Sequence, residues 1–466
     1  MVSAQKKLNS TGRRSGRWRT SERCRCRAAQ ELDSLKLLYA ASSGDGHTMP
    51  GHPECFARSN AALNGLNTAL EEANQATVND ASTPRDLEQL KNALANGVDY
   101  DEATDELLQL VHVPAYVEGL RELLPRAREA GCMTIETGGP TYFTPYSVMA
   151  AVSAVGAACA VADEIVAFNN AAVSTPAGLV LTRPPGHHAV PGGPKGFCLY
   201  NGAAVVARHV QQKHNCDKVV VIDFDVHYGN GTADAFRDDS SVLYASMHQE
   251  RIFPFEGNID EVGQGEGEGC NLALPLPAGT GRTLAFESWD TVIAPKAREF
   301  LRDAKKCFVV ISAGFDAHFL DPTAQFMWDA SDYYHLARRA RELAGECAGG
   351  RLLYIMEGGY HVDNGNEASR GVGGALGVSI AELTRSTLGL ASLEETLAAR
   401  GNQVEASAPE KKAGLFGNMF GGGGGGAKVD PVEASRFALY GRAPRPDEPM
   451  ELGMDILHRA RQIHGI

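Results

Sequence analysis

The sequence contains no pair of cysteines at Cys-x-x-Cys spacing, although ten cysteines are spread along its 466 residues. A disulfide framework and a cysteine-ligated zinc site are therefore not expected, and a reducing compartment fits the chain better. Long apolar runs are also lacking. Residues 148–162 come nearest, but this stretch is rich in alanine and is followed by Asp163 and Glu164. We interpret it as a buried helix, and no association with a membrane is expected.

Acidic residues are scarce at the start of the chain. The first 27 residues hold nine Lys or Arg and one acid, Glu22, and they contain no apolar core of a secretory signal. A cationic, hydroxyl-rich and acid-poor composition is typical of organellar transit peptides. We therefore predict that residues 1–33 are a leader that directs the chain to a chloroplast or mitochondrion. The alternative is a basic tail on a cytoplasmic or nuclear protein.

The rest of the chain lacks the positive charge that nucleic-acid binding requires. It holds 35 basic and 56 acidic residues. No cationic field offsets the repulsion of phosphates, so direct nucleic-acid binding is not expected. The same field attracts cationic amines and basic peptides. Nothing in the sequence indicates an oligomeric state.

Short apolar runs alternate with helical patterns through the middle of the chain. Such alternation predicts an α/β fold with a mostly parallel sheet, helices on both faces and an active site at the carboxyl ends of the strands. Strands are expected at residues 35–39, 178–181, 218–224, 242–247, 307–312 and 352–356, and helices at residues 147–168, 203–214, 286–305 and 332–347.

Composition also divides the chain into segments. A catalytic domain is expected over residues 34–403, followed by a flexible glycine-rich linker over residues 404–449 and a tail, residues 450–466, that could form a short helix. The alternating glycines of residues 263–269 have no predicted strand before them. We interpret them as a loop and not as a nucleotide-binding turn.

Acids and a histidine follow two of the predicted strands. Asp223, Asp225 and His227 alternate along one side of an extended segment, and Asp316 comes soon after the strand at residues 307–312. Asp225, His227 and Asp316 would supply three protein ligands and leave a position open, which is typical of catalytic zinc. The same ligands suit Fe(II), Co(II) and Mn(II). Each aspartate alone would more readily be interpreted as a cap at a strand end.

Other polar groups are expected at the same edge of the sheet. His187 and His188 follow one predicted strand, and Gly358, Gly359 and Tyr360 follow another. Glycines allow the backbone to approach a ligand closely. The Tyr360 phenol is a candidate donor to a developing oxyanion.

Together these motifs resemble the zinc-dependent histone deacetylase and acetylpolyamine amidohydrolase superfamily. The series is RPPGHH, GFC, DFDVHYGNGT, SAGFDAH and EGGY, in this order, and the Asn230-Gly231-Thr232 ending is similar to the class II branch. The resemblance spans residues 35–378 and includes His52-Pro53-Glu54 and Arg58. It implies an arginase/deacetylase-like α/β fold and hydrolysis of an amide.

The resemblance also implies roles for individual residues. Zn²⁺, one per chain, would be held by Asp225, His227 and Asp316. His188 would be the general base and acid, His187 its companion tied to Asp223, and Asn230 the group that orients His188. Tyr360 would polarise the acetyl carbonyl. The implied substrate tunnel comprises Gly196, Phe197, Phe253, Gly358 and Gly359, and the implied monovalent-cation site, for K⁺, comprises Asp223, Asp225, His227, Ser246 and Met247.

Two positions depart from the family pattern. Tyr228 stands where the family usually has histidine, and Pro140 replaces an aspartate before Thr141. The first bears on the shape of the pocket and the second on its rim. Neither touches an implied zinc ligand or Tyr360, so we expect an active enzyme.

The predicted activity is metal-dependent removal of acetyl groups from N-acetylated amines, above all acetyl-lysine in proteins. A deacetylase of acetylpolyamines or acetylated arylamines is the alternative, and Glu250, Glu256 and Asp260 could then pair with a second ammonium. A non-catalytic acetyl-lysine-binding scaffold would require a broken site, which intact His188 and Tyr360 argue against. An arginase-type dimanganese hydrolase lacks its second set of ligands.

Overall fold

The computed structural model describes residues 35–42, 44–80, 95–168, 174–362, 373–396, 398–399 and 448–466. The predicted leader and the predicted linker up to residue 447 lie outside the described residues.

A parallel eight-stranded sheet forms the centre of the described structure, in the order β2-β1-β5-β10-β9-β6-β7-β8. Its inner strands are apolar runs because both of their faces are buried. This confirms the predicted α/β class. The strands are β1 Leu37–Ala41, β2 Ala95–Gly97, β5 Ala177–Leu181, β6 Lys218–Asp223, β7 Val242–Gln249, β8 Asn271–Leu276, β9 Cys307–Ala313 and β10 Leu352–Met356.

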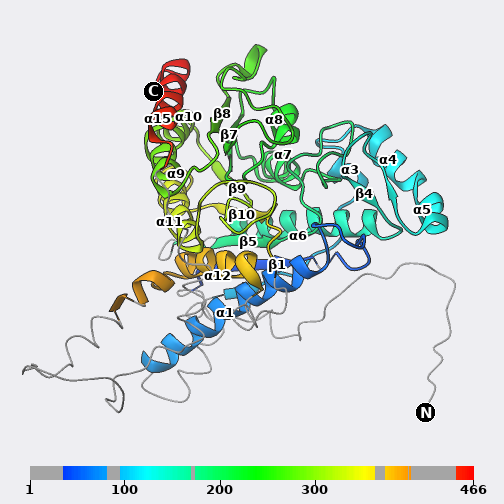
Figure 1. Ribbon diagram of the computed structural model, residues 1–466, viewed down its shortest axis with the longest axis horizontal. Coiled ribbons are helices and arrows are strands. Elements are labelled where there is room, and N and C mark those ends of the chain that lie inside the picture. The colour runs from blue at the N-terminus through cyan, green and yellow to red at the C-terminus, as the bar shows by residue number, and fades with distance from the viewer. Residues whose placement is uncertain are drawn as a thin grey trace, which may run out of the picture.

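Helices cover both faces of this sheet (Figure 1). Alternate residues of one strand enter different cores: in β6, Val219 and Val221 pack toward α6 and α7, whereas Val220 and Ile222 pack toward the face of α10 and α11. The longer helices are α1 Ala57–Asp80, α4 Pro114–Glu122, α6 Ser147–Ala167, α7 Gly202–His214, α10 Ala294–Leu301, α11 Ala330–Cys347, α12 Gly374–Leu388 and α15 Met450–His464. The shorter elements are α3 Asp105–Leu108, α5 Leu124–Ala130, α8 Asn230–Ala235, α9 Arg282–Ser288 and the antiparallel pair β3 Met133–Thr134 and β4 Tyr142–Phe143.

Helix α6 is the one described helix that is long and apolar enough to cross a membrane. In this fold 72% of its most apolar window is buried. It packs against β1, β5 and α7 as a core helix, as the alanine-rich sequence predicts.

Some elements differ from the sequence predictions. The helix expected over residues 286–305 is divided into α9, a π-helical turn Trp289–Ile293 and α10. Strand β8 and helix α12 were not predicted at all. Pro275 interrupts the β8 sequence, and proline suits a strand only where its missing N–H costs no ladder bond, as at the end of a sheet. The glycines of residues 263–269 form a loop with one 3₁₀ turn, Gly265–Gly267.

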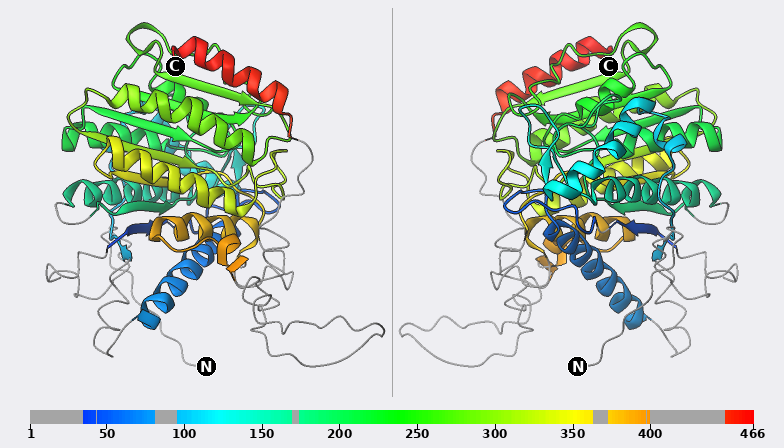
Figure 2. Two further views of the ribbon diagram at one scale, coloured as in Figure 1. Left: turned by 90° about the vertical axis from the view of Figure 1, so that its left-hand side faces the viewer. Right: turned by 90° about the vertical axis from the view of Figure 1, so that its right-hand side faces the viewer.

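The C-terminal helix α15 returns to the sheet and lies along its β8 end (Figure 2). Its Leu457 and Ala460 are buried in the core on that face. Just before the helix, the Glu448 carboxylate accepts backbone N–H bonds from Gly281, Thr283 and Leu284, which satisfies donors at the start of α9. The described fold therefore includes the last residues of the chain.

Candidate functional site

Four adjacent strands, β5, β10, β9 and β6, end at one edge of the sheet and place the predicted site residues there. His187 and His188 follow β5, Asp225 and His227 follow β6, Asp316 follows β9, and Gly358 to Tyr360 follow β10. Parallel strands bring these segments together although 173 positions separate His187 from Tyr360 in sequence.

Asp225, His227 and Asp316 form a buried cluster that could hold a metal ion. One ligand atom from each lies within 4.8 Å of the others. His227 Nδ1 is 3.1 Å from Asp225 Oδ1 and 3.1 Å from Asp316 Oδ2. The second oxygens are held by the backbone: Gly358 N–H donates to Asp225 Oδ2 at 2.8 Å, and Val226 N–H donates to Asp316 Oδ1 at 3.0 Å. The cluster thus directs one nitrogen and two oxygens to one point.

The two buried carboxylates of this cluster favour the binding of a cation. Burial and the neighbouring Asp225 raise the pKa of Asp316 to about 7. Burial would lower the pKa of His227, but hydrogen bonds and charge attraction from both aspartates raise it to about 10. Two buried carboxylates thus share one cationic imidazole. A divalent ion in place of that imidazole proton would compensate both, so the donor set fits the expected metal.

Two glycines make room for these carboxylates. A Cβ on Gly314 would lie 2.1 Å from Asp225 Oδ2, and a Cβ on Gly358 would lie 2.1 Å from Asp316 Oδ2. Any other residue at either position would push a carboxylate out of place. The glycine requirement is therefore part of the geometry of the cluster.

The two adjacent histidines lie in opposite electrostatic environments. His187 Nδ1 is 3.0 Å from Asp223 Oδ2, and although burial alone would lower the pKa of His187, Asp225 and Asp223 raise it to about 10. His188 Nδ1 is 2.9 Å from Asn230 Oδ1. Burial, followed by the charges of His187 and His227, holds the pKa of His188 well below its usual value. The surroundings of His187 therefore favour its cationic form, and those of His188 favour its neutral form.

Tyr360 is held from both sides. The Arg58 guanidinium lies over its ring, 4.8 Å from the centroid, and Arg58 Nε donates to the Gly359 carbonyl at 2.7 Å. The Asp321 carboxylate accepts from the backbone N–H of Tyr360 at 2.6 Å and of His361 at 3.3 Å. Burial raises the pKa of the Tyr360 phenol well above 10, so its O–H is retained. Sequence reasoning missed Asp321, although its position five residues after Asp316 was a usable signal.

Two aromatic rings pack against His188 and Tyr360. Phe253 contacts His188 edge-on, with ring centroids 4.9 Å apart, and Phe197 contacts Tyr360 edge-on at 5.5 Å. Gly196, at φ +53°, lies so close that a Cβ there would be 2.5 Å from His188 and 2.6 Å from Phe253. The sequence-predicted tunnel residues are therefore grouped around His188 and Tyr360.

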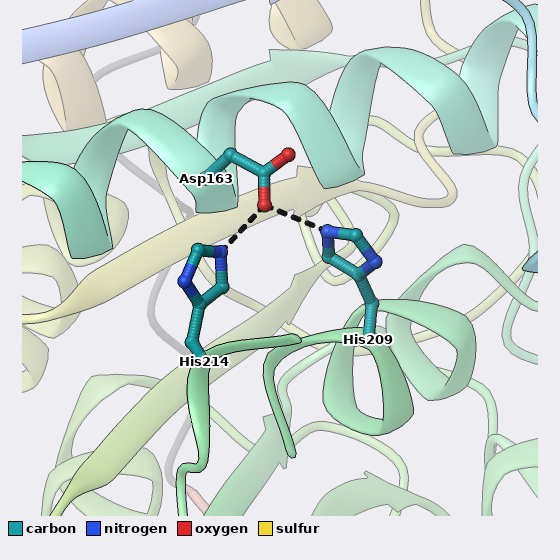
Figure 3. Close-up of side chains that lie close together, drawn as sticks. All are labelled: Asp163, His209 and His214. Atoms are coloured by element: carbon teal, nitrogen blue, oxygen red, sulfur yellow. Dashed lines mark hydrogen bonds and ion pairs between the residues drawn. The ribbon is translucent and has the colours of Figure 1, made fainter. Parts of the chain in front are cut away.

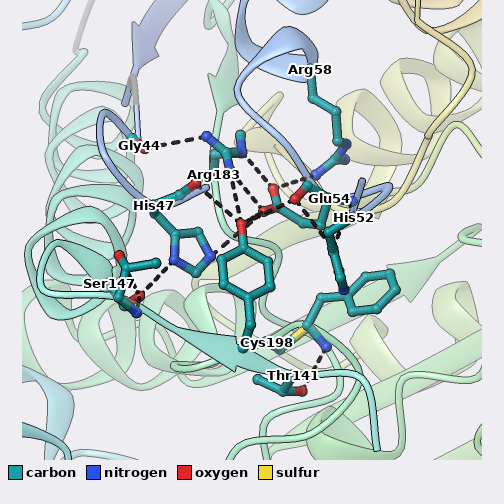
Figure 4. A network of polar contacts seen from close by, with 12 residues as sticks. Gly44, His47, His52, Glu54, Arg58, Thr141, Ser147, Arg183 and Cys198 are labelled. Atoms are coloured by element: carbon teal, nitrogen blue, oxygen red, sulfur yellow. Dashed lines mark hydrogen bonds and ion pairs between the residues drawn. The ribbon is translucent and has the colours of Figure 1, made fainter. Parts of the chain in front are cut away.

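A buried network of ion pairs connects Glu54 with Arg58 and Arg183 (Figure 4). The Glu54 carboxylate accepts from Arg183 Nε at 2.6 Å, from Arg183 Nη2 at 2.9 Å, from Arg58 Nη1 at 3.2 Å and from the Tyr142 hydroxyl at 2.8 Å. Burial alone would raise the pKa of Glu54, but Arg183 and then His47 and Arg58 lower it to about 2. Glu54 thus fixes Arg58, which in turn contacts Tyr360.

Of the residues predicted for a monovalent cation, Asp223 lies in β6, Ser246 and Met247 lie in β7, and Asp225 and His227 follow β6. Asp223 of β6 is in register with Ser246 of β7. The Asp223 carboxylate accepts from the Asp225 backbone N–H at 3.0 Å and from the Tyr244 hydroxyl at 3.0 Å, and the Ser246 hydroxyl is 3.0 Å from His248 Nδ1. Tyr228, which replaces the usual histidine, is buried and hydrogen-bonds with Asn271 at 3.0 Å.

Three acids that could bind the second ammonium of a polyamine, here called the rim acids, are Glu250, Glu256 and Asp260. Each of them has a basic neighbour. Glu256 pairs with Lys195, Asp260 pairs with Arg459 of α15 at 2.6 Å, and Glu250 lies 3.5 Å from the Arg251 guanidinium. These carboxylates are therefore already partly compensated by the chain itself.

Comparisons with known proteins identify the family of this chain. Residues 52–376 match the histone deacetylase domain. The chain is 39% identical over 364 residues to "Histone deacetylase 14, chloroplastic" of Arabidopsis thaliana, covering 78% of this chain and 79% of the relative. It is 36% identical over 269 residues to "Polyamine deacetylase HDAC10" of Homo sapiens, covering 56% of this chain and 38% of the relative.

A solved structure shows the same fold. The crystal structure of the HDA15 HD domain superposes with a TM-score of 0.61 at 29% identity, and the match covers 80% of this chain and 95% of that one. The family acts on acetylated substrates. With this extent of similarity, the chain belongs to the histone deacetylase family and is a hydrolytic deacetylase.

Proposed function

We propose that this chain is a zinc-dependent deacetylase whose principal substrates are proteins carrying acetyl-lysine. The observation that carries the proposal is the convergence of Asp225, His227 and Asp316 with His188 and Tyr360 at one edge of the sheet. Deacetylation needs a metal site, a base and an oxyanion donor within reach of one carbonyl. The three functions have candidates here, each held by backbone or side-chain hydrogen bonds.

Asp225, His227 and Asp316 would hold the zinc ion. When bound, zinc would lower the pKa of a water molecule and polarise the acetyl carbonyl. Three protein ligands leave a coordination position for solvent or substrate, as in other catalytic zinc sites.

His188 would move the proton. Its Nδ1–H donates to the Asn230 amide oxygen, so the lone pair of the neutral ring lies on Nε2. His188 Nε2 would accept a proton from the attacking water, whose oxygen bonds to the amide carbon. The same proton would pass to the leaving nitrogen as the C–N bond breaks, which gives acetic acid and the amine, and these become acetate and the ammonium at neutral pH. His187, held cationic by Asp223, would stabilise the negative charge that develops nearby.

Tyr360 would donate its O–H to the oxyanion of the tetrahedral intermediate. Arg58 and Asp321 fix the ring and the backbone of Tyr360, so little reorganisation is required at the moment of reaction. Phe197 and Phe253, with Gly196, Gly358 and Gly359, would enclose the methylene chain of the substrate.

The pairing of the rim acids favours acetyl-lysine over acetylpolyamines. A polyamine specialist needs an unpaired carboxylate to receive the second ammonium, since a buried unpaired charge is costly. Glu256 and Asp260 are engaged with Lys195 and Arg459. The similarity to a polyamine deacetylase supports the alternative that the substrate is an acetylated small molecule. Acetylated arylamines belong to the same alternative.

The test is a comparison of kcat/KM on acetyl-lysine peptides, acetylspermidine, acetylputrescine and an acetylated arylamine with one preparation of the whole chain. We expect the highest values on the peptides. A higher value on an acetylpolyamine, together with its loss in Glu250→Gln, would overturn the substrate choice while leaving the chemistry in place.

Two further parts of the proposal concern the cation and the compartment. K⁺ would bind oxygen atoms of Asp223 and Ser246 and backbone around Asp225, His227 and Met247, so activity should depend on K⁺ concentration and decline in Ser246→Ala.

Residues 1–33 would direct the chain to the chloroplast, as the basic leader and the chloroplastic relative suggest. Diffuse cytosolic or nuclear signal from a reporter fused to residues 1–33 would refute that address.

A further inference from the structure

A second histidine–carboxylate cluster lies away from the deacetylase site. It consists of Asp163 on α6 and His209 and His214 on α7. Helix α7 begins beside the active-site loops, where Gly202 N is within 2.8 Å of the Cβ position of Gly186, and it ends at His214 just before β6 starts. The cluster therefore lies toward the amino-terminal ends of the strands, opposite the catalytic edge.

The three side chains point at one another (Figure 3). Asp163 Oδ1 is 2.7 Å from His209 Nε2 and 2.6 Å from His214 Nε2. The two imidazole rings are nearly perpendicular, with centroids 6.0 Å apart. Two ring nitrogens from one helix and a carboxylate oxygen from the next thus converge on a common point, although 46 and 51 residues separate the histidines from Asp163.

The donor set is the one that zinc-type ions prefer. Imidazole nitrogen and carboxylate oxygen bind such ions at about 2.0–2.2 Å, which places ligand atoms of a tetrahedral site about 3.3 Å apart. The two distances from Asp163 Oδ1 to the imidazole nitrogens are shorter than this and would lengthen by about 0.6–0.7 Å to admit an ion. Such a movement is available because all three side chains are partly exposed, at 28% for Asp163, 11% for His209 and 17% for His214.

Lys213 supplies an outer partner for the same carboxylate. Its ammonium is 2.6 Å from Asp163 Oδ2, the oxygen that the histidines leave free. Without a metal, Lys213 and the two imidazole N–H groups satisfy Asp163. With a metal on Oδ1, Lys213 would remain on Oδ2 and orient the carboxylate, as outer partners of metal ligands commonly do.

We propose that Asp163, His209 and His214 form a second binding site for a divalent transition-metal ion, with zinc as the probe, and that the ion clamps α6 to α7. The ligands are Asp163 Oδ1 and the two Nε2 atoms, and water completes the coordination. Each histidine carries its proton on Nδ1 in the bound state. The role is structural, because the cluster lies at the end of the sheet opposite His188 and Tyr360. The proposal shares no residue with the deacetylase site and does not depend on the proposed function.

The test uses the whole chain loaded with one equivalent of zinc and titrated with more Zn²⁺ by calorimetry, with zinc content measured after dialysis. We expect a second equivalent to bind the wild-type chain and to raise Tm by about 4 °C at a hundredfold excess over Kd. His209→Gln, His214→Gln and Asp163→Asn should weaken this second event by at least about 100-fold, since loss of a direct ligand exceeds the loss of an outer partner. Deacetylase activity should be unchanged in all three.

Two matched variants sharpen the result. His458→Gln removes an exposed histidine of α15 and should leave the second event unchanged. Lys213→Gln keeps a donor for Asp163 but removes the positive charge, so it should tighten binding by on the order of tenfold. A wild-type chain that binds one equivalent only, or a second event that persists in the Asp163, His209 and His214 variants, would overturn the proposal.

Discussion

The two histidine–carboxylate clusters of this chain use the same residue types in opposite proportions. At the carboxyl ends of the strands, two aspartates share one histidine, and both aspartates are buried. Toward the amino ends, two histidines share one partly exposed aspartate, which also receives Lys213. The first cluster has an excess of negative charge, and the second is balanced by its own donors.

The pKa values of Asp316 and Asp163, one from each cluster, shift in opposite directions. Burial and Asp225 raise the pKa of Asp316 to about 7, so a bound cation would favour the ionised form of this carboxyl in the proposed zinc cluster. Burial would also raise the pKa of Asp163, but hydrogen bonds from His209, Lys213 and His214 hold it well below its usual value. The proposed zinc cluster should therefore bind a metal ion tightly, whereas the second cluster has its own donors and should bind one more weakly.

Removing one carboxylate from each cluster gives the largest expected contrast. Asp316→Asn should lose the tightly bound zinc and reduce deacetylation to background, because only two ligands remain. Asp163→Asn should keep that zinc and the activity within about twofold, as surface changes away from a site usually do. Zinc content and kcat/KM on one acetyl-lysine peptide measure both. Equal losses in the two variants would show that the clusters are not functionally separate.

Within the catalytic edge, Tyr360→Phe separates metal binding from oxyanion stabilisation. Zinc content should stay unchanged, while kcat falls by about 10²–10³, the usual cost of losing one preorganised donor. Tyr334→Phe, on α11 with its hydroxyl on the Leu390 carbonyl, is the matched control and should keep full activity. Full activity of Tyr360→Phe would remove that residue from the mechanism.

Glu54 is a third buried carboxylate, and unlike those of the proposed zinc cluster its negative charge is paired with two arginines of the chain. Glu54→Gln leaves Arg58 and Arg183 buried without their partner, so the free energy of unfolding should fall by about 3–5 kcal/mol. Glu72→Gln breaks the more exposed contact with Arg385 and should cost about 1 kcal/mol or less. Urea denaturation measures both. Similar losses of unfolding free energy in the two variants would mean that burial does not determine how much these ion pairs stabilise the fold.

The pH dependence of stability follows from the same carboxylate and is the smallest effect. Glu54 has a pKa of about 2 in the folded chain, below its ordinary value of 4.5, because Arg183 and its neighbours outweigh the effect of burial. The folded state thus binds fewer protons than the unfolded state in this range. Its contribution should be complete above pH 4.5 and should decline as the pH falls toward 2. The wild-type chain should lose more stability over this window than Glu54→Gln, as urea midpoints at a series of pH values would show.

The sequence predicted which residues meet at the carboxyl edge of the sheet better than it predicted contacts elsewhere in the molecule. Apolar runs followed by Asp, His or Gly-Gly-Tyr mark strand ends, and parallel strands bring such ends together by topology. Asp163, His209 and His214 carry no such signal, because their meeting depends on how α6 packs against α7. The same holds for Glu54, whose partner Arg183 is 129 residues away. Strand β8 was missed because Pro275 weakens its pattern, and only its place at the end of the sheet makes that proline acceptable.

The return of helix α15 to the sheet has a practical consequence for cutting the chain. The match to the deacetylase family ends at residue 376, which invites truncation soon after α12. Such a truncation would remove the Glu448 cap from α9 and uncover Leu284 and the β8 end of the sheet, a surface prone to pairing with other molecules. It would also remove Arg459, the partner of Asp260 on the rim loop. The smallest unit for expression and crystallisation therefore extends to the last residue.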